Sequence, residues 1–201
     1  MLRGTWILFC WLLLLPSLGN ATPVIRQATG LASPDVTVDF GESLYASGTI
    51  ITNEFAVDGV TFGPDYAYRD GLSGHPALTR GYLQNTTSGN QPGSIFFATD
   101  VTAVAFSYTS NIANTTFSAY LDGVLVESFT APTEGTTTAG GSGLYHGFEG
   151  IVFDEIRMEL DIANTLMTVD NLQYVVVPEP STALLFGIGL GCLGWRRRGL
   201  A

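Results

Sequence analysis

The chain has 201 residues and a formal net charge of −10, with 18 acidic residues against eight arginines and no lysine. A polypeptide this acidic is repelled by phosphate backbones, so the charge argues against a nucleic-acid-binding protein. The two cysteines and three tryptophans must be located before the composition of the folded part is known.

The first 21 residues have the pattern of a secretory signal peptide. A short start containing Arg3 precedes an apolar run over residues 6–15, and Gly19 and Ala21 supply small residues for a cleavage site. We therefore expect export by the Sec machinery and cleavage by signal peptidase after Ala21. An uncleaved N-terminal anchor is disfavoured because the apolar run has only about ten residues.

The middle of the chain reads as short strands separated by Gly, Pro, Asn and Asp. The strongest signal is a hairpin of residues 115–121 and 124–129 joined by Asp122-Gly123, because a type I′ turn needs positive φ at both central residues. Residues 63–93 are less regular and predict long loops with one strand near 78–83. The other predicted strands are 35–40, 48–55, 57–62, 94–98, 101–108, 144–153, 155–160, 166–169 and 172–177.

No window of this middle part supports a long amphipathic helix. Many short strands, with turns every 8–12 residues or so, predict an all-β body over residues 22–176. We expect an antiparallel β-sandwich of the jelly-roll or Greek-key type.

The last residues, 177–201, combine three features in series. Val177, Pro178, Glu179 and Pro180 form an extended stalk, since proline has no donor and a fixed φ. Residues 181–195 are uncharged and mostly apolar or small, which predicts a transmembrane helix of about 22 Å. This helix is short for a stable anchor of ~20 residues. The cluster that follows marks a cytoplasmic stop; it consists of Arg196, Arg197 and Arg198.

This tail resembles the PEP-CTERM sorting signal of Gram-negative bacteria, which membrane peptidases called exosortases recognise. The order, spacing and C-terminal position of the three features carry the resemblance. It implies an exosortase as partner, a transient stay in the inner membrane, and a final place on the cell surface or outside the cell. The alternative is an ordinary membrane anchor that is never cut.

Both ends remove residues from the composition of the body. All three tryptophans and both cysteines lie in the predicted signal peptide or in the C-terminal tail. The two cysteines are Cys10 and Cys192. The body keeps four arginines against 17 acidic residues, a formal charge of −13. It has no disulfide, although its compartment would allow one, so burial alone must stabilise it.

Two short blocks of the body, residues 52–62 and 169–174, resemble blocks in other PEP-CTERM proteins. This resemblance implies a relation to sandwiches of the carbohydrate-binding-module type. Exposed aromatic residues are the usual platform for a sugar. The candidates are Tyr66, Tyr68, Tyr82 and Tyr145, with packing of these rings against the sandwich as the alternative.

Acidic side chains near strand ends are candidate ligands for a structural Ca²⁺, which prefers oxygen donors. They are Asp39, Glu42, Glu54 and Asp170. The alternative is that these are edge and turn residues that face water.

Catalytic motifs are not found: the body has no cysteine, no nucleophile elbow, no His-Glu-x-x-His and no phosphate loop. We therefore predict no catalytic residues and a non-enzymatic protein. The resemblance to PEP-CTERM proteins implies that it belongs to the envelope or extracellular matrix and is associated with exopolysaccharide or biofilm. The alternative is a secreted, glycosidase-like hydrolase of matrix polysaccharide, since a pair of carboxylates cannot be recognised from sequence alone.

Overall fold

The computed structural model describes residues 21–42, 45–71, 78, 81–86, 92–110, 112–133, 144–163 and 165–178. Within them the fold is all-β and antiparallel, as predicted, with two short 3₁₀ turns, η1 (Phe40–Glu42) and η2 (Ala56–Asp58). The strands are β1 (Thr22–Gln27), β2 (Val36–Val38), β3 (Val60–Phe62), β4 (Tyr66–Arg69), β5 (Tyr82–Asn85), β6 (Gly93–Ser110), β7 (Thr115–Leu121), β8 (Val124–Ala131), β9 (Tyr145–Leu160) and β10 (Met167–Val176).

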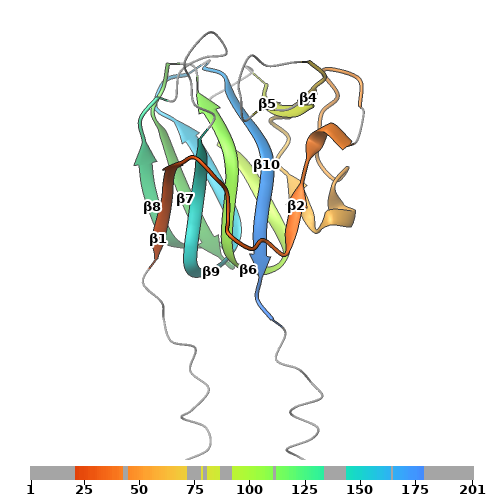
Figure 1. The fold of residues 1–201 in the computed structure, drawn as a ribbon. Helices are drawn as coiled ribbons and strands as arrows, with labels where there is room; N and C mark the ends of the chain where they lie inside the picture. Colours follow the sequence, from red (N-terminus) through yellow and green to blue (C-terminus); the bar gives the residue numbers. More distant parts are fainter. Residues whose placement is uncertain are drawn as a thin grey trace, which may run out of the picture.

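Hydrogen bonds join all ten strands into one continuous sheet. Its main path runs β4-β5-β10-β6-β9-β7-β8, while β1 pairs with β9, β2 with β10 and β3 with β6. The long strands β6 and β9 connect the two ends of this path (Figure 1). The first part of β6 pairs with β3 and the end of β9, and its second part pairs with β10 and the start of β9.

The core is filled mainly by aromatic rings on the inner face of this sheet. Phe117 of β7 stacks on Phe129 of β8 at 5.0 Å between ring centroids. It also meets Tyr108 of β6 at 5.0 Å, although β6 and β7 are not paired. The sheet therefore closes over on itself, and buried rings supply the stability that the body must find without disulfides.

The predicted hairpin is confirmed. Residues 115–121 and 124–131 form β7 and β8, and the turn between them has the two left-handed residues expected, Asp122 (φ 51°) and Gly123 (φ 76°).

Other predicted strands merge or move. Residues 94–98 and 101–108 form one strand, β6, whose ladder with β9 shifts register on either side of Val101. The strands expected at 144–153 and 155–160 likewise form a single strand, β9 (Tyr145–Leu160), with Gly150 at φ 81°. A β-bulge interrupts the alternating pattern without ending the strand, so the sequence showed breaks where the backbone continues.

The first half of the body differs more from prediction. Residues 48–55 were expected to be a strand but contribute only an isolated bridge, Ile50 to Ala67. The irregular segment 63–93 contains β4 and β5, and β5 lies a few residues after the strand expected near 78–83. Strand β1 was not predicted, because Pro23 and a left-handed Arg26 (φ 54°) disturb its pattern.

The start of β1, the first described strand, and the end of β10, the last, lie at the same end of the fold. Thr22 of β1 pairs with Glu149, Glu149 with Ala103, and Ala103 with Val175 of β10. Three strand spacings separate the two ends of this row, or about 14 Å. Figure 1 shows β1 beginning and β10 ending at the same pole of the body.

Across the part of the chain that the structure describes, no helix has the length and apolar character to cross a membrane. The predicted transmembrane segment 181–195 and residues 1–20 of the predicted signal peptide lie outside the described residues.

Candidate functional site

The sorting motif begins where β10 ends. The N–H of Val177 donates to the main-chain oxygen of Asp100 at 2.9 Å, and the next residue, Pro178, is exposed. Proline offers no N–H to continue the ladder, so the sequence itself stops pairing here. Glu179, Pro180, Arg196, Arg197 and Arg198 lie outside the described residues.

Asp35 completes the other side of β10. Its N–H donates to the Tyr174 carbonyl at 3.0 Å, and its Oδ2 accepts from the Val176 N–H at 3.0 Å. Strand β2 itself reaches only the Tyr174–Val36 pair. The carboxylate of Asp35 therefore takes the place of the next main-chain carbonyl and extends the pairing of β10 by one residue.

The candidate calcium ligands are not gathered into one site. Asp39 Oδ1 accepts from the Gly41 N–H at 2.9 Å, and Asp170 Oδ1 accepts from the Asn171 N–H at 2.7 Å. Glu42 lies in η1. Among the described residues, no three or more His, Cys, Asp or Glu side chains form a group that could hold a metal ion.

Glu54, the remaining calcium candidate, accepts a hydrogen bond from the main chain of the turn in which it lies. Its Oε2 accepts from the Thr52 N–H at 2.5 Å, and this hydrogen bond lowers the pKa of the carboxyl. Side chains that bond the main chain a residue or two away are typical of turns. A turn role therefore fits the hydrogen bonds of Asp39 and Glu54. Asp170 differs, because it is fully buried within β10.

The candidate sugar platform is wrong for two of its four tyrosines. Tyr66 and Tyr68 lie on β4 and are fully buried. The Tyr66 ring packs edge-on against Phe62 at 5.6 Å, and burial raises the pKa of its hydroxyl well above the usual value. Tyr82 and Tyr145 are half-buried, and they lie on separate strands, β5 and β9. The four rings therefore form no common exposed face.

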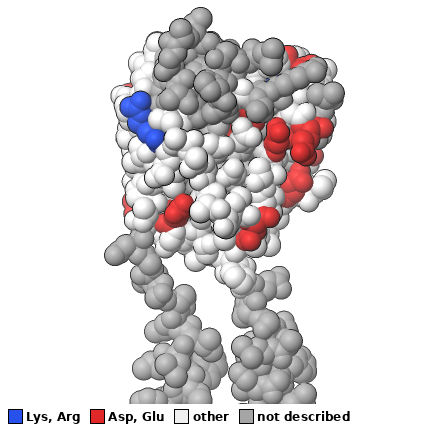
Figure 2. Space-filling model, viewed as in Figure 1, with Lys and Arg blue, Asp and Glu red and all other residues white. Residues whose placement is uncertain are grey.

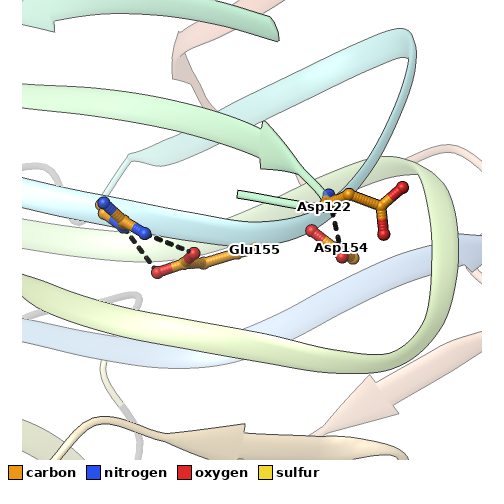
Figure 3. Close-up of polar contacts among 4 residues, drawn as sticks. Asp122, Asp154 and Glu155 are labelled. Carbon is orange, nitrogen blue, oxygen red and sulfur yellow. Dashed lines mark hydrogen bonds and ion pairs between the residues drawn. The ribbon is translucent and has the colours of Figure 1, made fainter. Parts of the chain in front are cut away.

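A polar cluster on the outer face of β9 was not predicted as a unit. The Arg157 guanidinium donates to both carboxylate oxygens of Glu155, at 2.6 and 2.8 Å (Figure 3). It also lies 4.0 Å from the centre of the Tyr120 ring. Glu155 is buried although it points outward. The alternation of Glu155 and Arg157 indicated an outer face, but the sequence could not place Tyr120 beside them.

A second polar contact lies next to this cluster. The Asp122 N–H donates to Asp154 Oδ2 at 3.2 Å, which ties the hairpin turn to β9 (Figure 3). On the face shown in Figure 2, acidic groups lie at several separate places and basic groups at one.

Comparison with known proteins identifies the tail. A family model described as the PEP-CTERM protein-sorting motif matches residues 176–198. The resemblance seen in the sequence is therefore confirmed, and the chain carries the C-terminal sorting signal of an exported protein that an exosortase processes. No curated protein matches the chain.

Proposed function

We propose that this chain is a non-enzymatic protein of the cell envelope or extracellular matrix, associated with exopolysaccharide or biofilm. The single observation that carries the proposal is the sorting motif, which starts at the last hydrogen bond of a folded, acidic β-body. The association with matrix polysaccharide rests on the resemblance to other PEP-CTERM proteins alone.

The route follows from the order of segments. Residues 1–21 act as a signal peptide, residues 22–176 fold outside the cytoplasm, and residues 177–201 hold the chain. The segment 181–195 spans the inner membrane, with Arg196, Arg197 and Arg198 on the cytoplasmic side. The span is short, so it suits temporary retention before processing. After processing, the body reaches the cell surface or the medium.

We also assign the curled sheet to the β-sandwich class of jelly-roll or Greek-key type. The support comes from rings that contact each other across unpaired strands, such as Phe117 with Tyr108 and Phe106. Long strands that turn from one layer into the other through bulges are a known way to join two packed sheets.

The experiment replaces Pro178, Glu179 and Pro180 together by alanine in the full-length chain, expressed in a host with its exosortase. The native chain is expected to shorten at its C-terminus and leave the membrane fraction, while the variant stays full length and membrane-bound. A matched control replaces Thr136, Thr137 and Thr138 by alanine, three changes in a Gly-rich stretch, and should be processed as the native chain is. If the Pro-Glu-Pro variant is processed at the native rate, the proposed route is wrong.

A further inference from the structure

The folded body leaves almost no free chain before the sorting motif. Within the described part of the chain, Val177 is the last residue with a main-chain hydrogen bond to the body, and Pro178 is the first residue of the Pro-Glu-Pro triplet. The residues that precede the motif belong to β10, where Val175 pairs with Ala103 and Val176 with Val101.

These last residues are held from both sides. On the β6 side, the Asp100 carbonyl accepts from Val177; on the β2 side, the Asp35 carboxylate accepts from Val176. Successive N–H groups of a strand point in opposite directions, so the two contacts together use the N–H groups of both residues that precede Pro178. Both partners, Asp35 and Asp100, are exposed residues.

A peptidase that binds its substrate as an extended strand needs the main-chain groups on both sides of the cut. Upstream of the motif these groups are occupied by Asp35 and by β6. Only three residues separate Val177 from the apolar segment that starts at residue 181, and three residues reach at most about 10 Å. The headgroup layer takes roughly 5–7 Å of that reach, which leaves no room for an enzyme cleft between the body and the membrane.

We propose that residues 175–177 must leave the sheet before the sorting motif can be cut, and that Asp35 is the latch that holds them. This inference rests on the proposed processing by an exosortase. Strand ends open more readily than strand centres, so the latch sets the fraction of chains that are ready for cleavage without unfolding the body. The folded body then controls its own release.

The test measures the rate of C-terminal processing by pulse–chase in the full-length chain. One variant inserts Gly-Ser-Gly-Ser between Val177 and Pro178, which supplies free chain without touching the body. A second, Asp35→Ala, removes the latch. Two matched controls are Asp35→Asn, which keeps a side-chain acceptor, and Asp100→Ala, which removes a nearby carboxylate but keeps the main-chain carbonyl that Val177 uses.

The spacer is expected to raise the processing rate several-fold, and Asp35→Ala to raise it by about threefold to tenfold, the effect of losing one ordinary hydrogen bond. Asp35→Asn and Asp100→Ala should stay near the native rate. With the spacer present, Asp35→Ala should have no further effect, because the strand no longer has to open.

An unchanged rate with the spacer overturns the inference, and a faster rate with the spacer but not with Asp35→Ala overturns the role of Asp35. Both outcomes differ from failure of the proposed function, in which the native chain and the Pro-Glu-Pro alanine variant are equally uncut or equally cut.

Discussion

At the scale of single residues, His146 shows how burial decides the role of a titratable group. Its ring is fully buried and stacks on Phe117 at 5.4 Å, and its Nδ1–H donates to the Leu144 carbonyl at 3.0 Å. Burial lowers the pKa of this histidine to about 4, and the charge of Arg26 acts in the same direction. A neutral imidazole in an aromatic core is a packing residue.

The lowered pKa of His146 predicts a pH dependence of stability. Between pH 6.5 and about 4 the unfolded chain binds a proton at this residue and the folded chain does not, so stability falls as the pH falls through that window. The loss amounts to about 3 kcal/mol of unfolding free energy by pH 4. Urea denaturation at pH 7 and pH 4.5 measures it. In His146→Phe, which keeps a ring but cannot titrate, the difference should shrink; an equal loss in both proteins would contradict the assignment.

The burial of Tyr66 and Tyr68, two of the tyrosines expected to form a sugar platform, could not be predicted from the residues around them. Tyr66 and Tyr68 lie between glycines and prolines that read as loop, and only their pairing with β5, about 15 residues later, makes them a buried strand. No local pattern carries that information. The opposite case is Asp122-Gly123, where two neighbouring residues are enough to specify a turn.

At the scale of elements, the hairpin of β7 and β8 allows a clean test of backbone strain. Gly123 has φ 76°, and a Cβ added there meets nothing within 4 Å. Gly123→Ala should therefore cost about 1–2 kcal/mol through the left-handed backbone alone. Gly123→Asn should cost less, because asparagine tolerates this region.

Gly147 of β9 gives the contrasting case. A Cβ there would lie 1.9 Å from the Val104 carbonyl oxygen of the neighbouring strand. Gly147→Ala should be far more damaging than Gly123→Ala, although the substitution is the same. The melting temperatures of the two variants, measured by thermal unfolding, test this prediction. Similar melting temperatures would show that β6 and β9 do not approach each other this closely at Gly147.

How well a strand could be predicted from the sequence depended on whether its pairing partner is close in the chain. Strands whose pairing is local, such as β7 and β8, follow from turn chemistry and alternation. The strands β6 and β9 were recognised as apolar segments but were divided at their bulges. Strand β1 pairs with residues more than 100 positions away and carries Pro23, so no local pattern predicts it.

At the scale of the whole molecule, the sheet protects its open edges. Among the described residues, β8 pairs only with β7, and its first three residues are exposed and apolar. Two features blunt this edge: a register shift between Ala119 and Tyr120, and Glu127, which lies on the same face as the core residue Phe129. Bulges and inward charges are known to keep edge strands from pairing with other molecules.

Removing the inward charge should therefore expose the edge. Glu127→Val is expected to make the protein associate in a concentration-dependent way, measured by light scattering during size-exclusion chromatography. The control Glu149→Val makes the same change on β9, between partners on both sides, and should behave as the native protein does. Equal behaviour of the two variants would mean that Glu127 does not protect the edge.

The positions of the two ends of the folded body fit the proposed export route. The start of β1 and the end of β10 lie in one row of the sheet, so a body tethered through both ends would present one pole to the membrane (Figure 1). The tail was recognisable from sequence because a sorting signal is linear. The row that brings the two ends together is a product of strand pairing, and no local segment contains it.

Mass spectrometry of the mature protein tests the central claim most directly, because it reads both ends of the product at once. The account predicts an N-terminus at Thr22 and a single C-terminus at or beside Pro178-Glu179-Pro180, with residues 181–201 absent. A mature chain that still ends at Ala201 would contradict it.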